Sequence, residues 1–169
     1  TPPHFSWIPR ASFQRRAVAS MASVRRHPPL MVPLSCLPVF YKPVIQYQIE
    51  AMREAGIEEI VIVVGKTGSK IRETLQNGEG LGVKLRYVVD DDPQGIASSL
   101  MRAKSKINGP FALFLGDIFL PKMDISAAVE RFILESADGV IIARAEKDPN
   151  QVMRNFEIVI NPGGGVTKV

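Results

Sequence analysis

An aspartate and a glycine-containing bend each follow a predicted β-strand, and together they could bind a ligand that carries phosphate groups. Asp117 closely follows the apolar run 111–115. The bend at residues 90–95, which contains Gly95, follows the apolar-rich run 84–89. Ligands of a parallel sheet bind beyond the carboxyl ends of its strands. A carboxylate placed there can bind Mg²⁺, and glycine lets the backbone approach a base or a phosphate closely. The chemistry to look for is therefore the binding or transfer of phosphate groups with magnesium.

These residues also have ordinary structural interpretations, which the residues alone leave open. Asp117 could equally cap a helix or close a turn. Gly95 could serve only to begin the helix that follows it, and from the residues alone we interpret it as a turn residue. The triplet Asp90, Asp91 and Asp92 could be a solvated acidic loop, which is the commoner fate of a run of like charges.

The elements that would position these residues alternate between helix and strand. Pro43 is predicted to start a helix that ends at Gly56, and the β-branched run 57–64 follows as a strand covered on both faces. The other predicted elements are a helix at 69–75, a strand at 84–89, a helix at 96–103, a strand at 111–115, a helix capped by Asp124 or Ser126, a strand at 139–143, and a hairpin of 156–160 with 166–169. This alternation predicts an α/β fold with a doubly wound, mainly parallel sheet in three layers, α/β/α.

Composition and cysteine content narrow the class of protein. The chain has 169 residues, of which 46% are hydrophobic and 22% charged, as in soluble globular proteins. Its apolar runs are shorter than the roughly 20 residues that span a bilayer, so we expect no membrane partner. Cys36 is the single cysteine, which excludes an intramolecular disulfide and predicts a reducing, cytoplasmic location.

The net charge of +4 comes from the N-terminal part of the chain. Residues 1–49 contain no Asp or Glu, and their Arg and Lys residues contribute +6, so the remainder sums to −2. Residues 1–36 are rich in proline and arginine and show no sustained periodicity, which predicts an irregular or disordered segment. An organellar transit peptide is an alternative that the prolines disfavour. Residues 37–169 are predicted to form the α/β domain, which lacks the basic module of a nucleic-acid-binding protein.

A P-loop is the other phosphate-binding motif that the sequence suggests. Gly65, Lys66 and Thr67 follow the predicted strand, but the first glycine of the motif would fall at Ile60, in the middle of that strand. We therefore interpret Gly65 as a strand end and Ser69 as the cap of the next helix.

Two stretches of the chain resemble the sugar-phosphate nucleotidyltransferases, the family of glucose-1-phosphate thymidylyltransferases and uridylyltransferases. One stretch contains Pro93, Gly95, Ile96 and Ala97 and continues into the strand that ends with Gly116-Asp117. The other begins with Leu37-Pro38-Val39 and continues through Ile49-Glu50-Ala51 to Ala55-Gly56-Ile57. The similarity runs in register from about Leu37 to Val169.

The resemblance implies a Rossmann-like nucleotidyltransferase fold, of which this chain would hold an incomplete N-terminal part. It implies transfer of a nucleoside monophosphate from a nucleoside triphosphate to a sugar-1-phosphate, with release of pyrophosphate and with magnesium as cofactor. Asp117 would hold the metal, while Asp90, Pro93, Gly95 and Gly116 would bind the nucleotide. The family has a glutamine at the position of Asp90, and a carboxylate can accept a hydrogen bond from a base but cannot donate one. A homo-oligomer is a further expectation.

Part of the family pattern is not recognisable in this chain. The family begins with a strand, a Gly-rich loop that contains arginine, and a Pro-Lys pair; here no glycine precedes Leu37, and Pro33-Leu34 stands at the Pro-Lys position. The family continues beyond the equivalent of Val169. We therefore expect a truncated or inactive enzyme, with a non-catalytic nucleotide-binding or regulatory module of the same fold as the alternative.

Overall fold

A computed structural model describes residues 16–20, 33–66, 68–119, 124–143, 145, 148 and 158–168. The chain divides into two compact units, Thr1–Val129 and Glu130–Val169. Among the described residues, no helix is long and apolar enough to cross a membrane.

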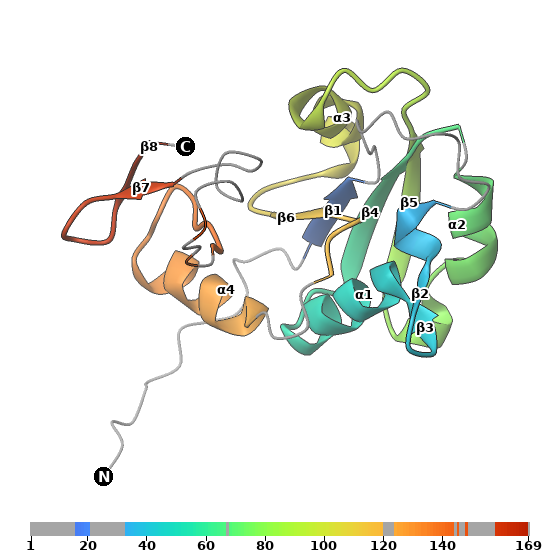
Figure 1. The fold of residues 1–169 in the computed structure, drawn as a ribbon, viewed down its shortest axis with the longest axis horizontal. Coiled ribbons are helices and arrows are strands. Elements are labelled where there is room, and N and C mark those ends of the chain that lie inside the picture. Colours follow the sequence, from blue (N-terminus) through green and yellow to red (C-terminus); the bar gives the residue numbers. More distant parts are fainter. Residues whose placement is uncertain are drawn as a thin grey trace, which may run out of the picture. The chain divides into compact units, whose positions relative to one another are not determined.

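The first unit is built on a four-stranded parallel sheet (Figure 1). Its strands are β1 (Arg16–Ser20), β4 (Glu59–Val64), β5 (Lys84–Val89) and β6 (Ala112–Leu115), in the order β5-β4-β1-β6. Every neighbouring pair is parallel. The sheet therefore has one edge at which all its strands end.

Apolar side chains cover both faces of this sheet, as the β-branched run in β4 predicts. Ile60, Ile62 and Val64 belong to one core cluster, while Val61 and Val63 belong to another. The alternation follows from the two-residue period of a strand. Helices α1 (Val44–Glu54) and α2 (Ser69–Leu75) contribute to the first cluster, and α3 (Ile96–Ala103) contributes Ala103 to the second. The predicted doubly wound, three-layer α/β architecture is confirmed.

Short elements connect the larger ones in the first unit. The 3₁₀ turns are η1 (Leu34–Cys36), η2 (Glu79–Leu81) and η3 (Lys104–Lys106), and the small antiparallel hairpin comprises β2 (Pro38–Val39) and β3 (Lys42–Pro43). Helix α1 begins after Pro43, which is its N-cap. The hairpin therefore leads directly into α1, and Phe40 at its tip has a positive φ of 56°.

Strand β1 differs from the irregular structure expected over residues 1–36. It pairs in parallel with β4 on one side and with β6 on the other. Its sequence, RAVAS, includes one β-branched residue and no aromatic residue, so its strand signal is weak and its stability comes from this double pairing. The strand that the family pattern requires ahead of Leu37 is therefore present as β1. The sheet contains β1, which precedes residue 37, and three strands that follow it. The domain boundary at residue 37 stays a prediction.

Helix α4 (Ile125–Leu134) begins as the sequence predicts, because Asp124 Oδ1 accepts a hydrogen bond of 2.9 Å from the Ala127 N–H. In the second unit, β7 (Val159–Ile160) and β8 (Val166–Lys168) form the predicted antiparallel hairpin. The predicted strand at 139–143 is wrong, since these residues form no strand and Ile141 and Ile142 are 49% and 48% exposed. An apolar β-branched run forms a strand only where a neighbour pairs with its backbone.

Candidate active site

The five residues singled out by the sequence lie beyond strand ends on one edge of the sheet. Asp90, Pro93 and Gly95 follow β5, while Gly116 and Asp117 follow β6. The strand ends are level, because Val64 pairs with Val89 and Ser20 pairs with Val63 and Leu115. The structure thus places both groups on the same edge, but on strands separated by β4 and β1.

Asp117 lies at the centre of a tight turn that follows β6. The Ile118 N–H donates to the Leu115 carbonyl at 3.2 Å, which leaves Gly116 and Asp117 as the two central residues of the turn. Gly116 is buried and Asp117 is exposed. The backbone of this turn is therefore held against the protein while the carboxylate is open to a ligand.

Gln48 of helix α1 holds this turn from beneath. Its side-chain Nε2 donates to the Leu115 carbonyl at 2.9 Å and also to the Ile118 carbonyl. The side chain is 5% exposed. Sequence reasoning did not identify this role, although one signal was present: Gln48 is a polar residue on the apolar face of a helix. A polar side chain at such a position needs a hydrogen-bond partner.

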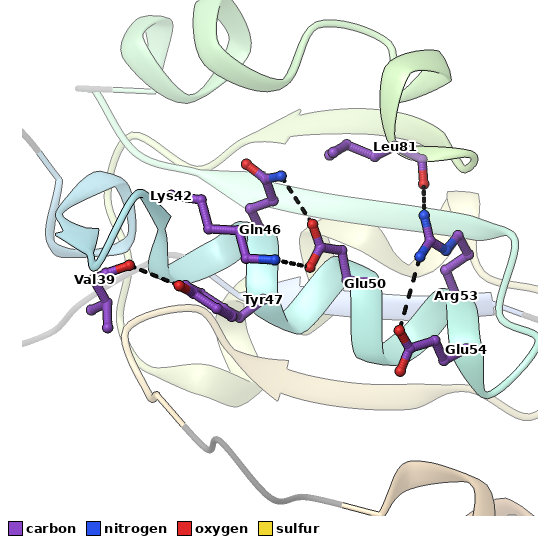
Figure 2. Close-up of polar contacts among 8 residues, drawn as sticks. All are labelled: Val39, Lys42, Gln46, Tyr47, Glu50, Arg53, Glu54 and Leu81. Atoms are coloured by element: carbon purple, nitrogen blue, oxygen red, sulfur yellow. Dashed lines mark hydrogen bonds and ion pairs between the residues drawn. The ribbon is translucent and has the colours of Figure 1, made fainter.

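Helix α1 makes a second contact with the chain after β6, through Tyr47. The rings of Tyr47 and Phe119 pack edge to face, with centroids 5.2 Å apart and planes inclined by 74°. The Tyr47 hydroxyl donates to the Val39 carbonyl at 2.8 Å (Figure 2). Tyr47 therefore links the β2–β3 hairpin to the segment that carries Asp117.

An ion pair between Lys42 and Glu50 strengthens the junction of the hairpin with α1 (Figure 2). The Lys42 Nζ also lies 4.4 Å from the ring centroid of Tyr47, and the Gln46 Nε2 donates to Glu50 at 2.9 Å. The hydrogen bond with Glu50 raises the pKa of Lys42. Partial burial works to raise the pKa of Glu50, but the hydrogen bonds from Lys42 and Gln46 and the nearby positive charges outweigh it and lower that pKa.

Asp90 is directed into the protein. Its N–H donates to the Val64 carbonyl at 2.8 Å, and its Oδ2 accepts a hydrogen bond of 2.8 Å from the buried Ser99 hydroxyl. The residue is 1% exposed. Its Oδ1 lies 4.0 Å from the Arg102 Nε and has no hydrogen-bond partner among the described residues. The solvated-loop interpretation therefore fits the exposed Asp91 and Asp92 but not Asp90.

Gly95 adopts a backbone conformation that is essentially restricted to glycine, with φ 125° and ψ 176°. It is the N-cap of α3, and its carbonyl accepts from the Ser99 N–H at 3.0 Å. A Cβ built on Gly95 would meet no atom within 4 Å. The turn therefore requires glycine for its dihedral angles, and the open side leaves room for another molecule to approach the backbone.

The segment after β4 adds a cation to this edge of the sheet. Lys66 is exposed and follows Gly65, in a turn where the Gly68 N–H donates to the Gly65 carbonyl at 2.9 Å.

The predicted cap at Ser69 is wrong, because α2 has Gly68 as its N-cap and no side-chain capping hydrogen bond. A Cβ on Gly68 would lie 2.5 Å from the Val64 Cβ, so close packing requires glycine there.

The donor set at this edge suits a magnesium ion that is shared with a bound phosphate. The described residues contain no group of three or more His, Cys, Asp or Glu side chains that could enclose a metal. Mg²⁺ is commonly held by one or two carboxylates together with phosphate oxygens of a substrate and water. The exposed carboxylate of Asp117 fits that arrangement, and Asp91 and Asp92 are further exposed carboxylates beyond the end of β5.

Comparisons with known proteins agree with this architecture. The chain is 37% identical over 123 residues to the low-salt glycan biosynthesis nucleotidyltransferase Agl11 of Haloferax volcanii, covering 70% of this chain and 34% of that protein. It is 32% identical over 116 residues to a glucose-1-phosphate thymidylyltransferase of an Actinoplanes species, covering 68% of this chain and 38% of that protein. The chain thus spans little more than a third of the length of these curated relatives.

Solved structures show the same fold. A UDP-glucose pyrophosphorylase complexed with UDP-glucose superposes with a TM-score of 0.62 at 21% identity, covering 73% of this chain and 55% of that one. The UDP-glucose pyrophosphorylase from Acinetobacter baumanii gives a TM-score of 0.62 at 22% identity, covering 74% and 54%. The sequence pattern of the family described as Nucleotidyl transferase matches residues 26–152, which is more than half of the chain. The chain therefore belongs to the nucleotidyl transferase family.

Proposed function

We propose that this chain carries the nucleotide-binding side of a sugar-1-phosphate nucleotidyltransferase. The observation that supports it most directly is the exposed Asp117 in a tight turn at the carboxyl edge of the sheet, within the region that matches the family. In the reaction, a phosphate oxygen of the sugar-1-phosphate attacks the α-phosphorus of a nucleoside triphosphate. A new phosphorus–oxygen bond forms, the bond from the α-phosphorus to the bridging oxygen breaks, and pyrophosphate leaves.

Each predicted site residue has a distinct task in this proposal. Asp117 would hold magnesium, which supplies positive charge opposite the phosphate oxygens when it is bound. Pro93 and Gly95 would line the base, since the open side of Gly95 leaves room for a planar group. For Asp90, which is 1% exposed, we replace the direct nucleotide contact that the resemblance implies with an indirect role: it would orient that bend from within, because its buried carboxylate is tied to α3 through Ser99. Gly116, which is buried, would shape the turn that presents Asp117 rather than contact the phosphates itself.

The groups available to bind the triphosphate decide between a catalytic and a non-catalytic protein. Lys66 is an exposed cation at the same edge. Residues 21–33, which connect β1 to η1 in the sequence, contain Arg25 and Arg26 but no glycine. Without a Gly-rich loop, fewer backbone N–H groups can approach the phosphates closely. Catalysis of phosphoryl transfer depends mainly on positioning and on electrostatic stabilisation, so this loss would weaken it. A nucleotide-binding module without catalysis is therefore the second candidate. For either candidate, the lone Cys36 supports a cytoplasmic location.

Pyrophosphate release tests the proposal. The purified chain is incubated with glucose-1-phosphate, Mg²⁺ and each nucleoside triphosphate in turn, and pyrophosphate is measured together with nucleotide binding by calorimetry. We expect release with at least one nucleotide, and its loss in Asp117→Asn. Asp124→Asn is the matched control, because asparagine also caps a helix well. Nucleotide binding without release would favour the non-catalytic module, and absence of both would contradict the two candidates.

A further inference from the structure

We propose that Gln48 is a positioning residue for the Asp117 carboxylate. By holding both ends of the Leu115–Ile118 turn, its side-chain amide would set the direction from which the carboxylate meets a bound divalent cation. The inference rests on the proposed role of Asp117 as a metal ligand.

The contact geometry supports a clamp rather than a chance contact. Gln48 Nε2 donates to the carbonyls of Leu115 and Ile118, which are the first and last residues of the turn. Both partners are acceptors, so the amide must present its nitrogen to the turn. Its Oε1 has no hydrogen-bond partner among the described residues. The orientation of the amide is therefore explained by the two hydrogen bonds that its nitrogen donates.

The helix that carries Gln48 is firmly anchored. Its neighbours Ile45, Ile49 and Met52 have no exposed surface in the core. Phe119, the residue directly after the turn, packs against Tyr47 of the same helix. Two adjacent positions of α1 thus fix the turn and the residue that follows it, so that the turn is held against a rigid element. Groups that orient a metal ligand by hydrogen bonds affect metal binding even though they do not touch the metal.

The turn itself would be loose without this clamp. Its own closing hydrogen bond, from the Ile118 N–H to the Leu115 carbonyl, lies at the upper end of the ordinary range, at 3.2 Å. The Leu115 carbonyl receives its shorter hydrogen bond, at 2.9 Å, from Gln48. Removing the amide would therefore let the backbone at Gly116 and Asp117 move, and the carboxylate with it.

Manganese titration followed by NMR tests this role, with Mn²⁺ as a paramagnetic probe in place of Mg²⁺. Bound Mn²⁺ broadens nearby amide signals, so the site can be followed residue by residue even when binding is weak. The variants are Gln48→Met, which removes both donors, and Gln48→Asn, which keeps the amide but shortens its reach. Gln46→Met is the matched control on the same helix, since Gln46 contacts Glu50 rather than the turn. Asp117→Asn removes the proposed metal ligand and shows what the NMR spectra look like without the metal site.

We expect Mn²⁺ to broaden the amide signals of residues 116–118 in the unsubstituted chain and not in Asp117→Asn. Gln48→Met should need about 10-fold more Mn²⁺ for the same broadening, as for other residues that orient metal ligands. Gln48→Asn should be intermediate and Gln46→Met unchanged. Amide hydrogen exchange at residues 116–118 should also become faster in Gln48→Met, which reports on the turn without any metal.

Other results would overturn the inference in distinguishable ways. If Gln48→Met and Gln48→Asn fold and bind Mn²⁺ as the unsubstituted chain does, Gln48 does not position Asp117, although the proposed metal site survives. If Asp117→Asn leaves the broadening unchanged, the proposed metal site fails and the inference fails with it. If both Gln48 variants lose their near-ultraviolet circular dichroism while Gln46→Met keeps it, Gln48 serves stability alone.

Discussion

The Ser99 hydroxyl donates a hydrogen bond of 2.8 Å to the Asp90 carboxylate, and both side chains are buried between α3 and the end of β5. This contact ties the first turns of α3 to the sheet at the same edge that carries Gly95. A buried carboxylate that loses its donor retains the full cost of leaving water.

Ser99→Ala should therefore lower the free energy of unfolding by about 1.5–3 kcal/mol, as for other hydrogen bonds to charged groups. Ser98→Ala, one position earlier on the same helix, should change it by less than about 0.5 kcal/mol. Urea denaturation of both variants measures the difference. Equal effects of the two substitutions would show that the Asp90 contact contributes little.

The Lys42–Glu50 pair should make stability depend on pH. The pKa of Glu50 is lowered in the folded protein, so its contribution is present above its ordinary value of 4.5 and is lost as the pH falls through the lower, folded value. The pKa of Lys42 is raised, so its contribution is present below 10.5 and is lost as the pH rises through the higher, folded value.

Glu50→Gln should thus be less stable than the unsubstituted chain at neutral pH, with a difference that shrinks at strongly acidic pH. Urea denaturation at a series of pH values measures this. Glu54→Gln is the control, because Glu54 is exposed and its ion pair with Arg53 is long, at 3.9 Å. A difference between Glu50→Gln and the unsubstituted chain that is the same at pH 3 and pH 7 would contradict the ion-pair explanation.

Tyr87 should lose its hydroxyl proton at a higher pH than an ordinary tyrosine does. Burial raises its pKa to about 12, although the nearby Arg72 works in the opposite direction. Its hydroxyl donates to the Gln76 carbonyl at 2.7 Å, which requires the neutral form. The contribution of Tyr87 to stability is therefore complete below its ordinary value of 10.0 and is lost as the pH rises through the folded value of about 12.

Ultraviolet absorbance of tyrosinate checks this expectation. A phase near pH 12 should disappear in Tyr87→Phe and persist when the exposed Tyr41 is replaced in Tyr41→Phe. Tyr87→Phe should also cost about 1 kcal/mol of stability at neutral pH through the lost hydrogen bond. Persistence of the late phase in Tyr87→Phe would exclude Tyr87 as its source.

Gly95→Ala should be destabilising because of its backbone angles and not because of crowding. Gly95 and Gly80 both have open space where a Cβ would lie, but only Gly95 of the two has a positive φ, 125°. Gly95→Ala should therefore cost about 1–3 kcal/mol, and Gly80→Ala, in the turn η2, should be close to neutral. Thermal unfolding compares the two. If Gly95→Ala and Gly80→Ala are equally stable, alanine at position 95 is not strained by the backbone conformation there.

Local patterns of side chains were enough to place most of the elements around the candidate site. Helices α2 and α3 and strand β5 have the predicted bounds. The spacing of apolar residues that distinguishes a helix from a strand can be recognised within a short stretch of sequence. The same patterns placed Asp117 and Gly95 after strands. Since parallel strands end at one edge, these residues were expected on that edge, where they lie.

Only the tertiary structure decided which segments pair and which polar groups are buried. The five residues of β1 include one β-branched residue and no aromatic residue, which is a weak strand signal, and the strand exists through its pairing with β4 and β6. Residues 139–143, in contrast, have a strand-like composition and form no strand. The burial of Asp90 depends on Ser99, and the clamp on the Asp117 turn depends on Gln48, which is 67 residues from Leu115 in sequence. Such contacts join residues that no local pattern relates, because their stability comes from hydrogen bonds formed only once distant segments have packed together.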